Sequence, residues 1–337
     1  MPTTMRAVVI HAPGGPEVLR LEERLQPVPG PDDVLIRVRA FGLNRSELFT
    51  RQGHSPNVRF PRVLGIEAVG TVAAAPGGSF RVGDTVATVM GGMGRAYDGG
   101  YADYTVVPAR QVRSVQTKLS WAELGALPEM LQTAWGALHR TLHLAPGDRL
   151  LIRGGTTSVG LAAAAIAKMT GADVMATSRR AESEARVRGC GADHFVIDSG
   201  TITDAVQRTW PEGADKVLEL VGTTTLEDSL RSVREGGVVC MAGMVGDAWT
   251  LDHFAPMDTI PTGVALTTYS GNVSDFLAMP LQPLVDAVED GRLPVSIGHV
   301  FPMVEIVAAH RLMESNGAGG MIVVVTEPAD AEACRPT

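Results

Sequence analysis

The sequence predicts a two-domain α/β protein, with one doubly wound parallel-sheet domain and one mostly β domain. The chain has 337 residues, enough for two domains at roughly 150 residues each. Residues 1–122 contain short β-branched runs separated by glycine and proline, which is typical of β structure. From residue 148 to residue 242, apolar strand patterns alternate with helical ones, which indicates a parallel sheet covered on both faces.

The first region is expected to form a compact, barrel-like β domain. Strands are predicted at Arg6–Ile10, Asp33–Ala40 and Thr85–Val89, with glycine-containing turns between them. The chain after residue 270 is too short for a domain and is expected to rejoin the first. It should contribute helices near 280–290 and 304–315 and a last strand at Met321–Thr326. Two domains are therefore predicted. Residues 1–122 and 270–337 would form the domain that binds the substrate, and residues 123–269 would form the domain that binds a dinucleotide.

The second region opens with a helix for which Ser120 is the expected N-cap and Glu123 the capping-box partner. Its strands are nearly all apolar and recur at regular spacing. The predicted strands are Leu150–Arg153, Val174–Thr177, Phe195–Asp198, Val217–Leu220 and Val238–Ala242, and the helices are 158–169, 181–189, 202–209 and 225–234.

Composition excludes several functions. The formal charge is −8, and no basic run is longer than Arg179-Arg180, which argues against nucleic acid and anionic membranes as partners. The three cysteines, Cys190, Cys240 and Cys334, are dispersed and form no C-x-x-C motif, so a four-cysteine zinc lobe is excluded. The N-terminus has no apolar signal region. We expect a reducing, cytoplasmic compartment.

A phosphate-binding loop is predicted after the strand at residues 149–153. Gly155 and Gly160 fill the first and third positions of G-x-G-x-x-G, Thr157 replaces the second, and Ser158 and Val159 open the helix. Backbone N–H groups at such a helix start bind a pyrophosphate. A glycine-rich turn in any doubly wound fold remains an alternative.

The choice of nicotinamide cofactor depends on the end of the second strand. Ser178 stands where an acidic residue would bind the ribose hydroxyls of NADH, and Arg179 and Arg180 follow it. Guanidinium groups bind a 2′-phosphate well, so the sequence predicts NADPH. Alternatively, the two arginines are solvated residues paired with Glu182 or Glu184.

Three segments resemble the motifs that carry the catalytic zinc ligands in medium-chain dehydrogenases. They are residues 42–47, 64–70 and 127–135, with Asn44, Ile66 and Glu129 at or near the ligand positions. An amide, a hydrocarbon and one carboxylate lack the thiolate and imidazole that zinc prefers. The resemblance extends from Met5 to about Val325 and is closest to the zinc-free quinone oxidoreductase branch. It implies a Rossmann domain, a GroES-like barrel and a homodimer formed through the outer strand at 264–269.

The resemblance also implies roles for individual residues. Asn44 would donate a hydrogen bond to the reacting oxygen, and Ser46 would retain a proton-relay hydroxyl whose next member is replaced by Phe49. Arg45 would reach the pyrophosphate. Alternatively, Asn44 is a turn residue that bonds its own backbone, and Arg45 is a surface residue. Cofactor contacts are implied for Thr133, Val221, Gly222, Gly243 and Met244, all of which also read as loop residues.

Two acidic residues and one loop complete the expectations. Glu67 is expected to pair with an arginine, and Glu129 either to pair or to exchange a proton near the site. The loop Gly91–Gly99 is expected to form part of the wall of the substrate pocket, and its first residues, Gly91–Gly94, a mobile, apolar lip.

The sequence thus predicts a zinc-independent, NADPH-dependent reductase that transfers hydride to a quinone or an α,β-unsaturated carbonyl. Its partner would be a small-molecule substrate that loop sequences do not define. Two alternatives stay open. One is a cofactor-binding sensor or structural protein without turnover, and the other is a pathway-specific enoyl reductase or non-redox enzyme.

Overall fold

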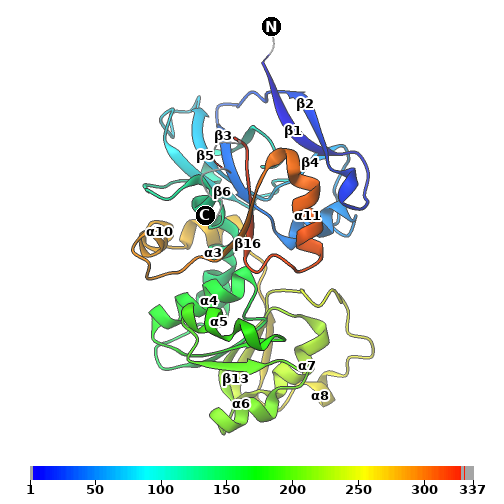
Figure 1. Cartoon of the computed structure of the whole chain (residues 1–337), viewed down its shortest axis with the longest axis vertical. Helices are drawn as coiled ribbons and strands as arrows, with labels where there is room; N and C mark the ends of the chain where they lie inside the picture. The colour runs from blue at the N-terminus through cyan, green and yellow to red at the C-terminus, as the bar shows by residue number, and fades with distance from the viewer. Residues whose placement is uncertain (1–2, 328–329, 331–337) are drawn as a thin grey trace. The chain divides into compact units, whose positions relative to one another are not determined.

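The computed structural model describes residues 3–327 and Asp330, which form two compact units (Figure 1). The first unit comprises Met1–Glu129, Asn272–Glu289 and Ser296–Thr337, and the second comprises Met130–Gly271 and Asp290–Val295. Residues 123–129 therefore group with the first unit and residues 290–295 with the second, unlike in the predicted division.

The first unit is built on two β-sheets. A three-stranded sheet has the order β2-β1-β4, and a seven-stranded sheet has the order β15-β16-β3-β5-β6-β8, with β7 also paired to β3. The expected return of the chain end is confirmed, because Val324 of β16 pairs with Phe41 of β3. The strands are β1 Thr4–Ile10, β2 Arg20–Leu25, β3 Asp33–Gly42, β4 Arg62–Val63, β5 Glu67–Ala74, β6 Thr85–Val89, β7 Tyr104–Pro108, β8 Val112–Ser114, β15 Ile297–Pro302 and β16 Met321–Val325.

Short helices accompany these sheets, and α2 Trp121–Gly125 packs against the inner strands β3, β5 and β16. The predicted cap of α2 is confirmed, since Ser120 Oγ accepts from the Glu123 N–H at 3.3 Å and the Glu123 carboxylate accepts from the Ser120 N–H at 2.8 Å. The other elements include the helices expected near 280–290 and 304–315. The helices are α1 Arg45–Arg51, α2 Trp121–Gly125, α9 Val273–Ala278, α10 Leu281–Glu289 and α11 Ile306–Glu314.

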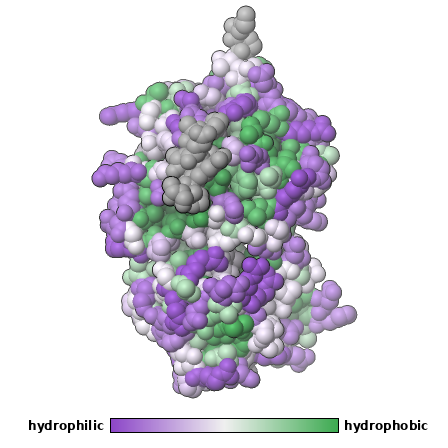
Figure 2. Space-filling model, viewed as in Figure 1, coloured by the Kyte–Doolittle hydropathy of each residue, from purple (hydrophilic) through white to green (hydrophobic). Residues whose placement is uncertain are grey.

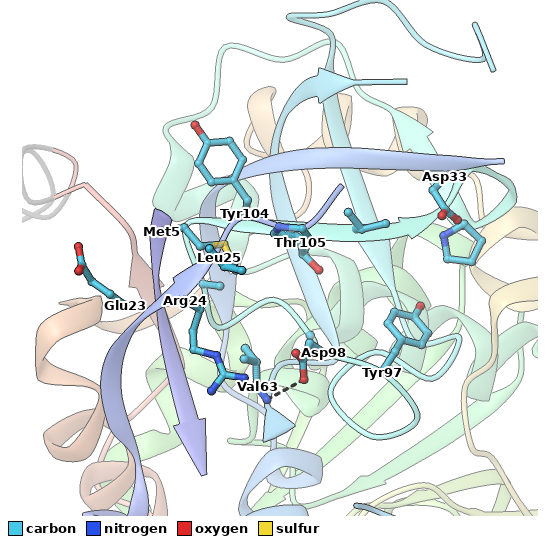
Figure 3. A pocket seen from close by; sticks show the side chains of 15 residues that line it. Met5, Glu23, Arg24, Leu25, Asp33, Val63, Tyr97, Asp98, Tyr104 and Thr105 are labelled. Atoms are coloured by element: carbon cyan, nitrogen blue, oxygen red, sulfur yellow. Dashed lines mark hydrogen bonds between the residues drawn. The ribbon is translucent and has the colours of Figure 1, made fainter. Parts of the chain in front are cut away.

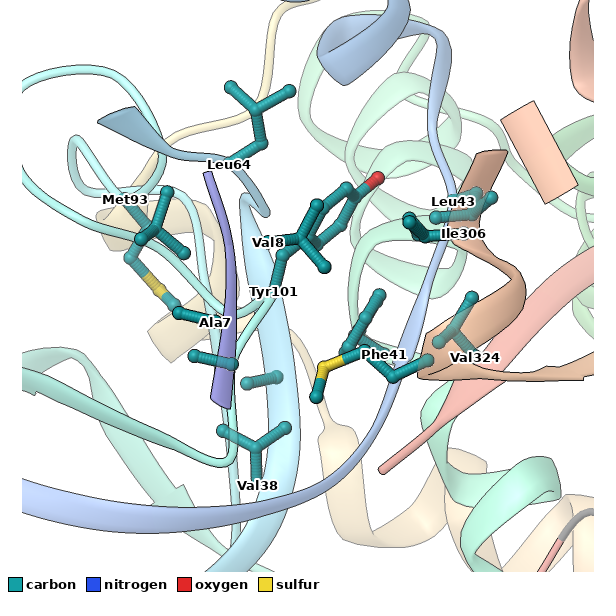
Figure 4. Packing of buried hydrophobic residues seen from close by; sticks show 14 of the residues in the cluster. Ala7, Val8, Val38, Phe41, Leu43, Leu64, Met93, Tyr101, Ile306 and Val324 are labelled. Carbon is teal, nitrogen blue, oxygen red and sulfur yellow. The ribbon is translucent and has the colours of Figure 1, made fainter. Parts of the chain in front are cut away.

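The core of the first unit packs aromatic and β-branched side chains from both sheets (Figure 4). Phe41 stacks on Tyr101 with ring centroids 4.6 Å apart. A polar chain is buried beside them: Tyr101 Oη lies 3.2 Å from His310 Nε2, and His310 Nδ1 lies 3.4 Å from Arg51 Nη1. Burial, followed by the Arg51 charge, lowers the pKa of His310 to about 3. The imidazole is therefore neutral.

The second unit is a six-stranded parallel sheet with the order β11-β10-β9-β12-β13-β14. The predicted strand–helix alternation is confirmed with small shifts. The predicted helix 225–234 is wrong at its end, because Val233 and Arg234 extend β13, where Val233 pairs with Ala214. The strands are β9 Arg149–Arg153, β10 Asp173–Ser178, β11 His194–Ile197, β12 Ala214–Glu219, β13 Val233–Met241 and β14 Ala265–Thr268, and the helices are α3 Pro128–Trp135, α4 Ser158–Thr170, α5 Glu184–Gly189, α6 Thr203–Thr209, α7 Thr223–Arg231 and α8 Pro256–Thr259.

Two cysteine thiols, Cys190 and Cys240, are buried in the second unit. The third, Cys334, lies outside the described residues. On the face drawn in Figure 2, hydrophilic side chains are interspersed with apolar ones. No helix in the described part of the chain is both long and apolar enough to span a bilayer.

Candidate active site

The three segments that resemble zinc-ligand motifs converge in the first unit around two buried glutamates. Glu67 Oε1 accepts from Asn44 Nδ2 at 2.8 Å, and Glu67 Oε2 accepts from the Glu129 N–H at 2.8 Å. Glu47 Oε1 accepts from the Ile66 N–H at 3.0 Å, and Glu47 Oε2 accepts from the Asn44 N–H at 3.1 Å. Hydrogen bonds therefore join residues of the three segments to Glu47 and Glu67.

Local sequence explains how these groups meet. Asn44 precedes α1 in extended backbone, and Glu47 three residues later accepts from its N–H, as in a helix-capping box. Gly42 leaves space for Glu67, because a Cβ there would lie 2.5 Å from Glu67 Oε1. Gly65, at φ +103°, brings the chain against Tyr101 just before β5 begins. The site thus depends on two glycines and one cap.

Both glutamates are almost fully buried, which changes their protonation. Burial raises the pKa of Glu47 to about 7. Burial, followed by repulsion from Glu129, raises the pKa of Glu67 well above its usual range, although the bond from Asn44 opposes the shift. The expected arginine partner of Glu67 is wrong, since its carboxyl oxygens contact an amide and a backbone N–H. Burial thus favours the uncharged form of Glu67, while its two accepted hydrogen bonds favour the carboxylate.

The residues at the three ligand positions do not fit zinc. Asn44 is an amide already bonded to Glu67, Ile66 is a hydrocarbon, and Glu129 offers a single carboxylate. Across the residues that the structure describes, no three His, Cys, Asp or Glu side chains are grouped so that they can hold a metal ion.

Ser46, the second predicted catalytic residue, is bonded to a residue that sequence reasoning missed. Arg95 Nη2 donates to Ser46 Oγ at 2.5 Å. Arg95 directly follows the expected apolar lip, Gly91–Gly94, and places a guanidinium beside Ser46. Arg45 donates to Asn316 Oδ1 within the first unit.

The phosphate loop of the second unit has the close packing that a dinucleotide cradle needs. A Cβ on Gly155 would lie 2.7 Å from Ala176 Cβ, and one on Gly160 would lie 2.6 Å from the Gly154 carbonyl oxygen. Thr157 caps α4, with its Oγ1 accepting from the Gly160 N–H at 2.9 Å. Ser158 and Val159 begin α4 as predicted. The substitution of Thr for the middle glycine thus serves the helix start, and the loop fits a pyrophosphate.

A buried arginine that the sequence analysis overlooked holds this loop. Arg153 ends β9 and donates to Asp198 at 2.9 and 3.0 Å and to Asp228 at 2.6 Å. Burial alone would raise the pKa of Asp198, but the hydrogen bonds from Arg153 and Gly200 lower it. These ionic bonds fix the strand end from which the loop departs.

The cofactor preference was predicted from the end of β10, and this strand end carries no acidic residue. Ser178 is buried, and its Oγ accepts from the Arg180 N–H at 3.1 Å. Arg179 and Arg180 are exposed. The alternative partner Glu184 is instead paired with Arg188 at 2.8 Å.

The remaining predicted cofactor residues follow β12 and β13 or lie on α3. A Cβ on Gly222 would lie 3.2 Å from both the Gly243 carbonyl oxygen and Met244 Cα, so these two loops are in contact. Glu219, which the sequence analysis also missed, positions the first loop by accepting from the N–H groups of Val221 and Gly222 at 2.7 and 3.0 Å. Thr133 is buried on α3.

A cavity of about 770 Å³ lies elsewhere in the first unit, near the β1–β2 hairpin (Figure 3). Tyr97, Asp98 and Tyr104 are among its lining residues, and none of the predicted site residues lines it.

The fold and the two sites define an oxidoreductase that binds a nicotinamide dinucleotide, and comparison with known proteins agrees. Residues 30–117 match the alcohol dehydrogenase GroES-like domain, and residues 190–324 match a zinc-binding dehydrogenase domain. Quinone oxidoreductase from Pongo abelii is 30% identical over 95% of this chain and 98% of its own. A 2-haloacrylate reductase from a Burkholderia species is 30% identical over 95% of this chain and 99% of its own.

Among solved structures, an NAD-dependent alcohol dehydrogenase superposes with a TM-score of 0.87 at 30% identity, covering 96% of this chain and 100% of the other. The chain therefore belongs to the medium-chain dehydrogenase/reductase superfamily, among the quinone oxidoreductases. It is an enzyme of the oxidoreductase class.

Proposed function

We propose that this enzyme is a zinc-independent, NADPH-dependent reductase of quinones or α,β-unsaturated carbonyl compounds. The observation that carries the proposal is the hydrogen-bonded cluster at the three former ligand positions. Asn44, held by Glu67, replaces a Lewis acid with a hydrogen-bond donor. The names of the relatives, quinone oxidoreductase and 2-haloacrylate reductase, support these two acceptor classes.

The chemistry assigned to the chain is charge stabilisation. When bound, the reduced nicotinamide supplies a hydride to the acceptor. Negative charge then grows on the acceptor oxygen, and Asn44 stabilises it with the second hydrogen of its amide, because the first is bonded to Glu67. Because burial raises the pKa of Glu67, its uncharged form is favoured, and that form would not repel this charge. Glu67 is thus a positioning residue for Asn44.

Replacing Asn44 tests this role. Asn44→Ala should lower kcat by roughly 100-fold with quinone or enone acceptors, the loss typical of one oxyanion donor. Affinity for the cofactor should be unchanged, because Asn44 is assigned to the acceptor. Stopped-flow absorbance of NADPH oxidation measures the first quantity and calorimetry the second. A variant with normal kcat would remove Asn44 from the chemistry, and wild-type protein that binds NADPH but reduces no acceptor would favour a sensor.

Zinc independence is tested separately. The purified enzyme should contain less than stoichiometric zinc by elemental analysis, and chelators should leave its rate unchanged. One zinc per chain that survives dialysis, with activity lost on its removal, would overturn this part of the proposal.

The preference for NADPH is proposed from the strand end, although the similar solved structure is NAD-dependent. Ser178 presents no carboxylate, and Arg179 and Arg180 are exposed, so their guanidinium groups are free of burial and can bind a 2′-phosphate. One charge-assisted contact contributes about 1.5 kcal/mol or more, so NADPH should bind on the order of tenfold more tightly than NADH. The double Arg179→Ala, Arg180→Ala variant should lose this preference while NADH affinity stays constant. Equal loss of both affinities would contradict the assignment.

We also propose a homodimer that forms through β14, the edge strand of the parallel sheet. Sedimentation at micromolar concentration should show twice the 35.5 kDa chain mass. A purely monomeric species would contradict it.

A further inference from the structure

Arg95 is a half-buried cation whose hydrogen bond goes to a neutral hydroxyl. Its Nη2 donates to the neutral Ser46 hydroxyl at 2.5 Å, and its Nε is shielded from solvent without a hydrogen-bond acceptor. Within residues 3–327 it takes part in no ion pair. Guanidinium groups removed from water are normally paired, because desolvation of an unpaired charge costs several kcal/mol. An unpaired one beside a predicted catalytic hydroxyl therefore needs an explanation.

The backbone fixes the place of this cation. Gly94, immediately before Arg95, has φ +69°, and a Cβ on it would lie 2.8 Å from the Gly65 nitrogen. A Cβ on Gly99 would lie 2.1 Å from the Gly65 carbonyl oxygen. The Gly100 N–H also donates to the Gly65 carbonyl oxygen at 3.1 Å. The loop is thus packed backbone to backbone against the segment that precedes Glu67, which holds Arg95 at the site.

The acids around Arg95 neutralise it only in part. Glu47 of α1 feels its charge, but burial still raises the pKa of Glu47 to about 7, so its uncharged form is well populated at that pH. Burial, followed by repulsion from Glu129, raises the pKa of Glu67 of β5 well above its usual range. Within residues 3–327, no ion pair joins Arg95 to Glu47 or Glu67. Arg95 therefore keeps positive charge beside Ser46.

We propose that Arg95 binds a carboxylate on the substrate, so that the preferred acceptors are α,β-unsaturated carbonyl compounds that carry an anionic group. A guanidinium offers parallel N–H groups that match a carboxylate, and the bond to Ser46 orients it. The inference rests on the proposed function and narrows its substrate class. In the reaction, one alkene carbon gains hydride from the reduced nicotinamide and the other gains a proton from solvent. The C=C π bond is lost, the cofactor is oxidised, and the carboxylate is unchanged.

The test uses a matched acid and ester. The probes are 4-oxo-2-pentenoate, an enone with a carboxylate, and its uncharged methyl ester. Wild-type enzyme should reduce the acid with a kcat/KM at least tenfold higher than the ester, and this ratio should fall as salt screens the charge. Arg95→Gln should remove the preference, lowering the value for the acid at least tenfold and that for the ester less than threefold. Arg95→Lys should retain part of it. Arg20→Gln, an exposed site on β2 of the same unit, makes the same charge change and should behave as wild type.

Calorimetry gives a readout without turnover. With NADP⁺ present, the saturated acid 4-oxopentanoate should bind wild-type enzyme at least tenfold more tightly than its methyl ester, and Arg95→Gln should bind both alike. Equal use of acid and ester by wild type, or equal losses in Arg95→Gln, would overturn the inference. If benzoquinone is still reduced in that case, the proposed function stands. If no acceptor is reduced, the proposed function fails, while the calorimetric comparison still decides the role of Arg95.

Discussion

The two units bury charged side chains in opposite ways. In the first unit, Glu47 and Glu67 are enclosed without an ion pair, and burial raises the pKa of both. In the second, Arg153 is fully enclosed but touches Asp198 and Asp228, and the pKa of Asp198 falls. The same loss of solvent therefore raises the pKa of two acids in one unit but leaves an ionic cluster in the other, because only the second unit places an arginine against its acids.

This difference separates two tasks. The ionic cluster stabilises a rigid strand end for the phosphate loop, where charge strengthens the structure. Glu47 and Glu67, with raised pKa values, hold an amide donor where added negative charge would oppose the reaction that we propose. Four predictions test the contrast, beginning with the largest effect.

Removing the charge of buried Arg153 should have the largest effect on the free energy of unfolding. Arg153→Met leaves Asp198 and Asp228 buried without their partner, which costs about 3–5 kcal/mol of unfolding free energy. Urea unfolding followed by circular dichroism measures the change. Arg231→Met removes a weakly paired, 60% exposed arginine nearby and should cost less than about 0.5 kcal/mol. A similar small loss for Arg153→Met would show that the cluster contributes little.

Glu47 should make the first unit less stable as pH rises. Its folded pKa, about 7, lies above the ordinary 4.5, so its contribution is fully present below pH 4.5 and is lost as pH rises through 7. At about 1.4 kcal/mol per pH unit the loss is roughly 3 kcal/mol. The stability of Glu47→Gln relative to wild type should increase by that amount from pH 4.5 to pH 7. If the stabilities of wild type and Glu47→Gln instead change with pH in parallel, the pKa of Glu47 in the folded protein is not raised above 4.5.

His310 should have the opposite effect to Glu47, making the first unit less stable as pH falls. Its folded pKa, about 3, lies below the ordinary 6.5, so the unfolded chain binds a proton first as pH falls. Stability is lost from pH 6.5 downward, by about 2 kcal/mol at pH 5. His310→Gln should lack this component when both proteins are unfolded by urea at the two pH values. Identical slopes would place a charged imidazole in the core.

The smallest effect concerns the start of α4. Thr157→Ala removes the cap on the Gly160 N–H and should cost about 1 kcal/mol. Thr157→Ser keeps a hydroxyl and should restore most of it, as thermal unfolding would reveal. If Ala and Ser variants are equally stable, the hydroxyl is not a cap.

Much of the fold could be predicted because its signals are local. The Ser120 cap, the glycine-rich loop before α4 and the alternation of strands and helices each depend on neighbouring residues. The site was predictable only where motif resemblance pointed, at Asn44, Ser46 and the phosphate loop. Arg95, bonded to Ser46 49 positions away, depends on long-range packing.

Some missed residues did leave a signal. Arg153 interrupts an apolar strand, and Glu219 ends another, both of which indicate buried polar partners. Asn44 and Glu47 have the spacing of the same capping pattern that was used at Ser120. The partner of Glu67 could not be predicted, because an arginine and a backbone N–H are equally able to satisfy a buried carboxylate.

The two buried thiols bear on how the enzyme would withstand the electrophilic acceptors that we propose. Quinones and enones alkylate cysteine, and the reactive form is the thiolate. Burial raises the pKa of Cys240 to about 12 and also raises that of Cys190, so both remain protonated and enclosed. On the proposed function, neither side chain consumes the electrophile, and turnover does not inactivate the second unit. N-ethylmaleimide should leave both cysteines unmodified in the native enzyme and label them after denaturation.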